Sequence, residues 1–280
     1  MAIITFTSNE IKETGQTLSC AALASHIAIE HNCKVMLIAT GYKESTLEDC
    51  FWEAEDRAAL IEGIVQNRKA IGLGTGVEGL VRALASKKTG PEIIKSYSKT
   101  ILRDRLDVLP SCKFKDYKDY EMISDKYSEI IQLANNYYDF VFIDVCSRMA
   151  DQYKDKISQI SDIIVLNLTQ RMKCIDNFIK LKAKDDFYKR KNIMLLIGRY
   201  DAYSKYNTKN ITRYMKERKP VNVIPYNTLF FEACSEAKII DFFLKMKNID
   251  ETDRNYLFIK EVTRLNSDII YRLQELQMQA

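Results

Sequence analysis

The chain has 280 residues, of which 46% are hydrophobic and 29% are charged, and only 9 are glycine and 4 proline. This composition excludes a disordered or fibrous chain, and the length is enough to bury one large core or one domain with an appended arm. The formal net charge of +4 is weakly basic, so it neither requires nor excludes a nucleic-acid or membrane partner.

The N-terminal sequence MAIITFTSNE has no basic region followed by a long apolar run, so it is not typical of a signal peptide. No apolar run approaches the length that spans a bilayer. The seven cysteines are an odd number without a Cys-x-x-Cys pair, and the spacing of His26 and His31 does not place them on one helical face. We therefore expect a cytoplasmic protein with reduced thiols and without a disulfide framework or a histidine metal site.

Short β-rich segments recur along the chain, and most are continuous apolar runs rather than alternating ones. Such runs are typical of parallel strands that helices cover on both faces. The expected strands are Ile3–Thr7, Val35–Ala39, Leu106–Leu109, Phe140–Val145, Ile163–Leu168, Ile193–Ile197 and Val221–Ile224. The most apolar of them, Ile3–Thr7 and Phe140–Val145, should lie near the centre of the sheet.

Helix-like segments alternate with these strands. Thr17–Glu30 is apolar on most faces, as a buried helix is, and the others are more amphipathic. The other expected helices are Asp116–Asn135, Met172–Lys184, Asn207–Lys216, Glu232–Lys245 and a long helix within Asp250–Gln279. The alternation predicts a doubly wound α/β fold with a mostly parallel sheet of seven or eight strands and helices on both faces. Residues 1–280 should form a single domain, with the helix of residues 250–279 packed on it or extending from it.

The segment Glu53–Arg105 is too long for a short crossover and is expected to form two or three helices. Its middle, Gly72-Leu-Gly-Thr-Gly76, is rich in glycine. It follows a predicted helix rather than a strand and lacks the third glycine spacing, so it is not a dinucleotide-binding fingerprint. Two interpretations stay open: a loop that caps the next helix, and a loop that faces a partner or a nucleotide.

The loop after the first strand, Ser8–Thr17, leads directly into a helix. Main-chain N–H groups at a helix N-terminus can hold a phosphate group. In the standard phosphate loop, G-x-x-x-x-G-K-[ST], Gly15 and Thr17 match the second glycine and the hydroxyl, whereas Gln16 replaces the lysine and the first glycine is missing. The local sequence is equally consistent with an ordinary strand–helix loop in which Thr14 or Thr17 caps the helix.

The chain as a whole resembles the ParA/MinD family of deviant-Walker P-loop proteins over roughly residues 1–245. Ile11-Lys-Glu-Thr-Gly-Gln-Thr17 aligns without a gap with the family's loop, K-G-G-x-G-K-[ST]. Tyr138-Asp-Phe-Val-Phe-Ile-Asp144 is similar to its Walker B strand, with the acid at the strand end. Segments similar to the later strands and the closing helix are Ser161–Asn167, Asn192–Arg199, Val223-Ile-Pro-Tyr226 and Glu232-Ala233.

This resemblance implies a site for ATP or ADP with Mg²⁺. The positions that it assigns to the nucleotide are Lys12, Glu13, Thr14, Gly15, Gln16, Thr17, Arg199 and Pro225. The positions that it assigns to Mg²⁺, directly or through water, are Thr17 and Asp144. Binding through the N–H groups of residues 13–17 and the helix dipole can survive even where other features of the loop are lost.

Several positions depart from the family pattern. Gln16 stands at the catalytic lysine, and glutamine donates hydrogen bonds but brings no charge. Ile11 stands at the signature lysine that reaches across a dimer, while Lys12 follows it between two glutamates. The second strand continues as Ile38-Ala-Thr-Gly-Tyr42, without the acid that orients the attacking water. Gly198, next to Arg199, stands at the adenine-contacting asparagine.

These departures imply weak or absent nucleotide binding, little or no hydrolysis, and no catalytic residue that can be assigned. The first function hypothesis is therefore a nucleotide-binding or pseudo-ATPase positioning factor for pilus (Flp/Tad) assembly or secretion, closest to the proteins called TadZ or CpaE, whose phosphate loops are often atypical. Its partners would be proteins of that machine, and the chain itself would be a monomer or a nucleotide-independent homodimer. The alternative is an active ParA-like ATPase that binds DNA and partitions a plasmid or chromosome, with Lys184–Lys191 and Arg213–Lys219 as the candidate basic runs.

An apolar stripe with three- and four-residue spacing follows the C-terminal segment. Its members are Ile259, Val262, Leu265, Ile269, Leu273 and Leu276. We expect this stripe to pack against the domain, with a helix–helix dimer seam as one alternative and a membrane-surface helix as another. Acidic residues mixed among the polar positions place a membrane partner last.

Overall fold

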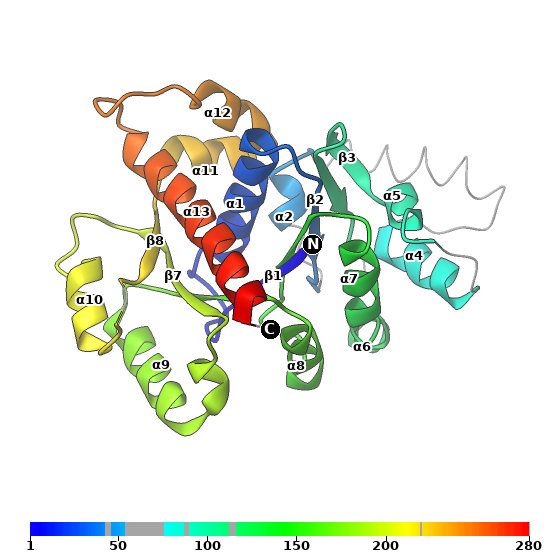
Figure 1. Cartoon of the computed structure of the whole chain (residues 1–280), viewed down its shortest axis with the longest axis horizontal. Coiled ribbons are helices and arrows are strands. Elements are labelled where there is room, and N and C mark those ends of the chain that lie inside the picture. Colours follow the sequence, from blue (N-terminus) through cyan, green and yellow to red (C-terminus); the bar gives the residue numbers. More distant parts are fainter. Residues whose placement is uncertain (43–45, 54–75, 87–89, 112–115, 219, 280) are drawn as a thin grey trace.

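The apolar runs of the sequence form the strands of one sheet (Figure 1). The computed structural model describes residues 1–42, 46–53, 76–86, 90–111, 116–218 and 220–279. Its strands are β1 (Ala2–Thr7), β2 (Val35–Ala39), β3 (Lys99–Leu102), β4 (Leu106–Leu109), β5 (Phe140–Asp144), β6 (Ile163–Leu168), β7 (Ile193–Tyr200) and β8 (Asn222–Pro225). Their order across the sheet is β3-β4-β2-β5-β1-β6-β7-β8.

The two strands expected at the centre, β1 and β5, are neighbours in the middle of this order. Every described pairing is parallel except that of β3 with β4, so the predicted mostly parallel sheet is confirmed. The sequence prediction missed β3. This strand lies at the sheet edge and its residues are only partly buried, so it lacks the continuous apolar run by which the other strands were found.

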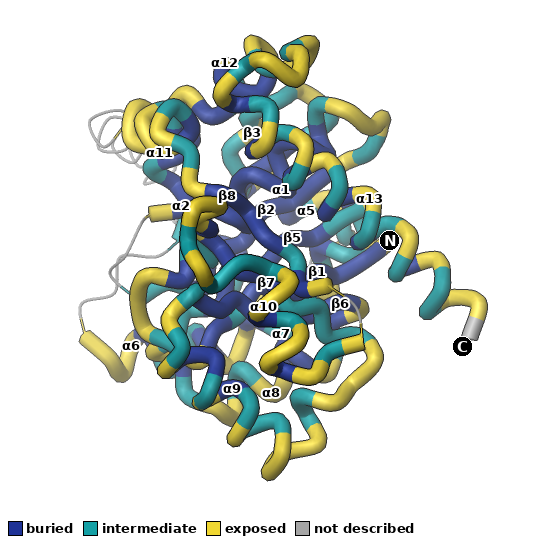
Figure 2. The backbone as a smooth tube through the Cα atoms, turned by 90° about the vertical axis from the view of Figure 1, so that its left-hand side faces the viewer, coloured by how far each residue is buried: buried dark blue, intermediate teal, exposed yellow. Residues whose placement is uncertain are grey.

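Alternate residues of each strand point to opposite faces of the sheet, and on these strands both sets are apolar. Helices cover both apolar faces (Figure 2). Ile4 and Leu37 face one layer, whereas Ile3 and Met36 face the other. The first layer consists of α1 (Gln16–Glu30), α2 (Thr46–Asp49), α11 (Thr228–Ser235), α12 (Ile239–Lys245) and α13 (Tyr256–Gln279). The second consists of α4 (Gly76–Ala85), α5 (Ile93–Tyr97), α6 (Tyr117–Ser124), α7 (Tyr127–Asn135), α8 (Asp151–Gln159), α9 (Met172–Lys184), η1 (Asp186–Lys189) and α10 (Thr208–Tyr214).

Two expected helices are each divided in two. Residues 116–135 form α6 and α7, and residues 232–245 belong to α11 and α12, which are separated by a turn that includes left-handed Ala237. The sequence prediction also missed α8. Within Glu53–Arg105 the described residues form α4, α5 and the edge strand β3, so the expectation of helices alone was wrong there. Residues 72–75 of the glycine-rich segment lie outside the described residues.

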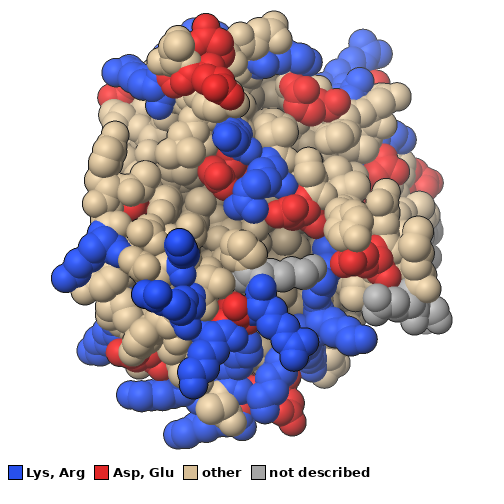
Figure 3. Space-filling model, turned by 60° about the vertical axis from the view of Figure 1, so that its left-hand side comes forward, with Lys and Arg blue, Asp and Glu red and all other residues tan. Residues whose placement is uncertain are grey.

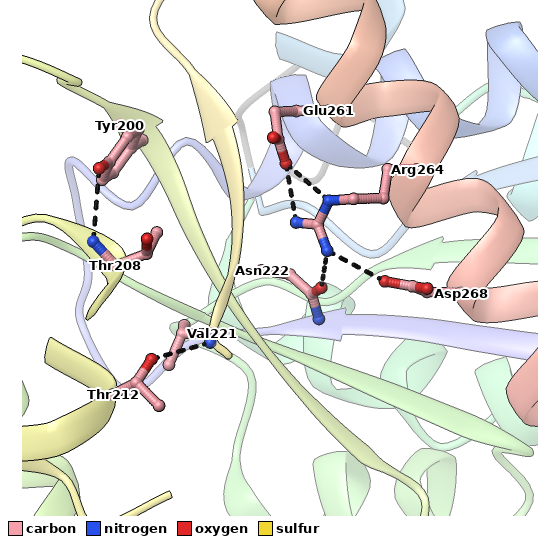
Figure 4. Close-up of polar contacts among 8 residues, drawn as sticks. All are labelled: Tyr200, Thr208, Thr212, Val221, Asn222, Glu261, Arg264 and Asp268. Carbon is pink, nitrogen blue, oxygen red and sulfur yellow. Dashed lines mark hydrogen bonds and ion pairs between the residues drawn. The ribbon is translucent and has the colours of Figure 1, made fainter. Parts of the chain in front are cut away.

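The C-terminal helix α13 lies across α1 and β8. Val262, Leu265 and Ile269 of its apolar stripe are fully buried in the domain's own core, so the stripe is not a free surface for a second subunit or a membrane. Figure 4 shows Arg264 fixing the helix to the sheet: its guanidinium donates to Asn222 of β8 and pairs with carboxylates on its own helix. No helix within the described ranges combines the length and apolar character that a membrane span requires.

His26 connects α1 to α13 in the interior. Its ring nitrogens lie 3.0 Å from Thr263 Oγ1 and 3.0 Å from Asn266 Nδ2, and the side chain is almost inaccessible to water. Removal from water lowers the pKa of His26 from 6.5 to about 4, since burial penalises the charged form. The unfolded chain therefore binds more protons than the folded chain between pH 6.5 and pH 4.

Stability should accordingly fall as the pH decreases from 6.5 toward 4, with a contribution from His26 of up to about 3 kcal/mol that is fully present above pH 6.5. Urea denaturation of the wild type at pH 7.5 and pH 5 measures the loss. An equal pH slope in His26→Gln and wild type would contradict the assignment.

Candidate functional site

The carboxyl ends of the central strands meet around Asp144, the last residue of β5. Asp144 pairs in register with Phe6 of β1 on one side and with Ala39 of β2 on the other. Its backbone carbonyl accepts a hydrogen bond from the Thr40 N–H at 3.0 Å. In open parallel sheets the crevice at the carboxyl ends of the strands is where ligands bind, so the sheet itself places the loop after β1 and the acid of β5 at one such crevice.

The loop of residues 8–15 presents unpaired N–H groups at the start of α1. Gly15 is the residue before the helix and is left-handed, with φ +66°, and no side chain caps the helix end. Within the described part of the chain, the N–H groups of residues 13–18 have no hydrogen-bond acceptor. The capping interpretation for Thr14 or Thr17 is therefore wrong. The N–H groups are instead left available to an anion.

Gln16 and Thr17 both donate hydrogen bonds to Asp144. Gln16 Nε2 lies 2.6 Å from Asp144 Oδ1 and 2.8 Å from the Val145 carbonyl oxygen. Thr17 Oγ1 lies 2.7 Å from Asp144 Oδ2. The amide at the position of the missing lysine is thus turned toward the carboxylate of β5 and its neighbouring backbone, and both carboxylate oxygens accept a bond from the first turn of α1.

Two glutamates flank Lys12 in this loop. Glu13, a left-handed residue with φ +71°, forms an ion pair with Arg171 at the start of α9. Its negative charge is therefore partly compensated. Lys12 and Ile11 are exposed, and Ile11 as a residue is 67% exposed. An exposed aliphatic residue now stands where the resemblance places a signature lysine.

The end of β7 presses against the same loop. A Cβ atom on Gly198 would lie 2.2 Å from the Thr14 carbonyl oxygen, so only glycine allows this approach. The next residue, Arg199, is left-handed with φ +52°, and its Cγ lies 2.9 Å from the point that a Cβ on Gly15 would occupy. The Arg199 side chain therefore passes directly over the glycine that begins α1.

Gly198→Ala should displace the loop, because the obstructing atom belongs to the backbone and cannot rotate away. We expect a stability loss of roughly 1–3 kcal/mol and weaker anion binding at the loop. Chemical denaturation and nucleotide titration of the variant measure the two effects. The matched control is Gly90→Ala, where the atoms nearest to the added Cβ belong to the flexible Glu92 side chain. Unchanged stability and binding in Gly198→Ala would contradict the close approach.

All the site residues predicted from the sequence line one cavity of about 260 Å³. They are Lys12, Glu13, Thr14, Gly15, Gln16, Thr17, Asp144, Arg199 and Pro225. The prediction missed the aromatic wall of the cavity, which consists of Tyr226, Phe230, Phe231 and Phe258. Tyr226 directly follows Pro225 and could have been found from that segment. Phe258 comes from α13, and only tertiary packing against Phe230, at 4.6 Å between ring centroids, brings it to the cavity.

The residues present fit a nucleotide with Mg²⁺. The free N–H groups at the start of α1 match phosphate oxygens, and the aromatic wall offers an apolar face to a base. Thr17 Oγ1 and an Asp144 oxygen lie side by side, and they are the hard oxygen ligands that Mg²⁺ prefers. Position 16 of the loop, where a phosphate-loop lysine would stand, holds glutamine.

Comparison with solved structures shows the same fold in proteins of low sequence identity. A ParA family ATPase from Chlorobium tepidum matches with a TM-score of 0.68 at 12% identity, over 95% of this chain and 97% of that one. The MinC:MinD cell division complex of Aquifex aeolicus matches with a TM-score of 0.61 at 12% identity, over 95% of each chain. A plasmid partition protein from Borrelia burgdorferi bound to AMPPNP matches with a TM-score of 0.54 at 17% identity, over 99% and 98%.

The MinD protein of Pyrococcus horikoshii, complexed with Mg-ADP, matches with a TM-score of 0.55 at 15% identity, over 88% of this chain and 93% of that one. No protein-family model matches the chain, and no curated protein matches it. The comparisons therefore show the fold: an eight-stranded, mostly parallel α/β sheet of the ParA/MinD ATPase type.

Proposed function

We propose that this chain is a nucleotide-binding switch of the ParA/MinD type that holds ATP or ADP with Mg²⁺ weakly and hydrolyses ATP slowly or not at all. The solved structures of similar fold that contain AMPPNP or Mg-ADP support the choice of ligand. Thr17 and Asp144 would hold the Mg²⁺ ion, and the N–H groups of the loop would hold the phosphates. When bound, the ion would neutralise part of the phosphate charge.

One observation carries the proposal of weak turnover. The Gln16 amide donates to Asp144 and to the Val145 carbonyl, so the position that would aim a cation at the phosphates holds a neutral group with two partners of its own. Phosphoryl transfer depends mainly on positioning and on stabilising negative charge. Without the loop lysine, the site loses much of that stabilisation.

The end of β2 supports the same conclusion. It continues into Thr40, which is fully buried and whose hydroxyl accepts a hydrogen bond from the Cys146 N–H at 2.8 Å. Among the residues that the structure describes, the carboxylates lining the cavity are Glu10, Glu13 and Asp144, and none of these three belongs to the end of β2. Steady-state ATP turnover tests the proposal: we expect wild type and Asp144→Ala both near background. Robust turnover by wild type that Asp144→Ala abolishes would contradict it.

The partner would be a protein of a pilus or secretion machine, where a scaffold that binds nucleotide without consuming it can act as a positioning factor. The altered phosphate loop supports this assignment, because the resemblance to TadZ or CpaE rests on it. Deletion of the gene in its host, complemented by wild type or by Asp144→Ala, provides the test. Loss of pili or secretion that wild type restores, and that Asp144→Ala with its damaged Mg²⁺ site does not restore, is the expected result. Unaltered assembly after the deletion would contradict the role.

A second candidate function, DNA binding, is favoured by one observation. Residues 171–219 contain 15 Lys and Arg against 5 Asp and Glu, whereas the rest of the chain contains 27 against 33. Figure 3 shows Lys and Arg gathered on the part of the surface formed by α9 and α10. The two basic runs meet in a groove of about 740 Å³ between η1, the end of α10 and α13.

Part of this basic groove is neutralised. Lys182 pairs with Glu217, and Arg272 with Glu275. Four cations of the groove have no carboxylate within ion-pair distance in the described part of the chain. Arg190, one of the four, lies over the Phe187 ring, which leaves Lys191, Lys216 and Arg218. Binding to phosphates should therefore rest on those three, and the triple alanine variant should flatten the salt dependence of DNA affinity by about 2–3 units of log–log slope. Lys118→Ala on α6 is the control. Absence of salt-dependent DNA binding by wild type would exclude this candidate.

A further inference from the structure

Two cationic side chains of the described part of the chain line the cavity, Lys12 and Arg199. Lys12 is exposed, and it follows Glu10 and precedes Glu13 in the loop. Arg199 comes from a different element, the end of β7, and has no carboxylate within ion-pair distance among the described residues. Its charge is therefore uncompensated at the mouth of a site whose loop carries Gln16 in place of the phosphate-loop lysine.

The backbone around Arg199 is shaped to bring this side chain over the loop. The pairing of β7 with β8 shifts register between Ile197 and Tyr200, so the strand bulges at Gly198 and Arg199. Gly198 allows the bulge to touch the Thr14 carbonyl. Arg199 itself adopts the left-handed conformation, which is uncommon for residues other than glycine and concentrates at functional sites.

The direction of the side chain follows from two contacts. Its Cγ lies over Gly15, the residue before α1, and its Cζ lies 5.9 Å from the centre of the Tyr226 ring. The side chain therefore extends from the glycine before α1 toward the aromatic wall. A planar group with five N–H donors in this place matches phosphate oxygens in a bidentate manner.

We propose that Arg199 supplies the positive charge that Gln16 does not, and that it binds the phosphate groups of the nucleotide from the β7 side of the cavity. This inference rests on the proposed nucleotide site. It assigns Arg199 a role different from that of the base-contacting residue beside which the resemblance places it. Arg199 is a binding residue here, and Tyr226 is left to face the base.

Titration calorimetry with Mg-ATP, inorganic tripolyphosphate and adenosine tests the proposal on wild type and Arg199→Ala. We expect Mg-ATP and tripolyphosphate to bind roughly 10- to 100-fold more weakly to the variant, which is the effect of losing a charge-assisted hydrogen bond, and adenosine to bind equally to both. Arg199→Lys should recover part of the loss. The matched control is Arg254→Ala, because Arg254 lines the neighbouring hollow but not this cavity.

The sharpest comparison moves the positive side chain from position 199 to position 16. In the double variant Gln16→Lys/Arg199→Ala, the lysine should restore the phosphate affinity that Arg199→Ala removes. Arg199→Gly separates binding from structure: it should weaken Mg-ATP binding as Arg199→Ala does, without lowering the melting temperature, since glycine adopts the left-handed conformation freely.

Failure of the Arg199 assignment and failure of the proposed nucleotide site give different results in these titrations. Equal Mg-ATP affinity in wild type and Arg199→Ala would overturn the role of Arg199 alone. An equal loss of adenosine and Mg-ATP affinity would instead make Arg199 a base contact and overturn the phosphate assignment. If wild type binds neither Mg-ATP nor tripolyphosphate at millimolar concentration, the nucleotide site itself is refuted, and this inference falls with it.

Discussion

Gln16→Lys should bind Mg-ATP roughly 10- to 100-fold more tightly than wild type, a gain of about 1–3 kcal/mol from one charge-assisted hydrogen bond. The side chain at this position already lies within 2.6 Å of Asp144 Oδ1, so a lysine there begins at the mouth of the phosphate site. Its ammonium group can leave the Asp144 carboxylate and contact the phosphates when the nucleotide enters. Calorimetry or competition with a fluorescent nucleotide measures the change.

The matched control is Gln132→Lys, which adds the same charge on an exposed position of α7 away from the cavity. It should leave the affinity unchanged, because a distant exposed charge is screened by salt. ATP turnover by Gln16→Lys should stay close to background, since β2 still ends without an acid. Unchanged or weaker Mg-ATP binding in Gln16→Lys would show that the missing lysine is not what limits affinity.

Mg-ATP should leave the mass of the wild-type particle unchanged in light scattering. The residue at the position of the signature lysine is Ile11, which is 67% exposed and cannot neutralise a phosphate on a second subunit. If the chain dimerises, apolar contacts must supply the interface, and these do not depend on nucleotide. The predicted mass is therefore that of a monomer of 32.5 kDa, or of a dimer, both with and without nucleotide.

Lys12→Ala tests whether Lys12 connects two subunits when Mg-ATP is bound. Because Lys12 directly follows Ile11 and is exposed, it is the one neighbour on the loop that could take over the signature role. In our account its replacement leaves the particle mass unchanged. A doubling of mass on addition of Mg-ATP, lost in Lys12→Ala, would show that Lys12 connects two subunits, and the interpretation as a degenerate switch would be wrong at that point.

The C-terminal helix illustrates what sequence pattern can and cannot determine. The spacing of Val262, Leu265 and Ile269 predicted an apolar stripe correctly, but the spacing alone left its partner open. The structure shows these side chains fully buried against α1 and the sheet, which removes the stripe from the candidate dimer surfaces. Periodicity defines which face is apolar, whereas the three-dimensional arrangement determines what covers it.

The sheet was largely predictable because its strands are continuous apolar runs covered on both faces. Strand β3 was missed since it is short, partly exposed and antiparallel at an edge. The divided helices were missed for a local reason: left-handed Ala237 breaks the pattern after α11, and no Gly or Pro marks that position. Such backbone features are set by tertiary packing more than by the residue type.

The candidate site was predictable in its loop and not in its walls. The order of Gly15, Gln16 and Thr17 before a helix is visible in the sequence, as is an acid at the end of an apolar run. The bond from Gln16 to Asp144 joins residues 128 positions apart and follows only from the pairing of β1 with β5. The passage of Arg199 over Gly15 likewise depends on a bulge in β7.

Nucleotide binding without turnover can be measured in one experiment: calorimetric titration of wild type with Mg-ATP, followed by assay of the same sample for released phosphate. We expect saturable binding that ADP displaces, with phosphate release at the level of a protein-free control. Either no binding up to several millimolar Mg-ATP or phosphate release well above that control would contradict it.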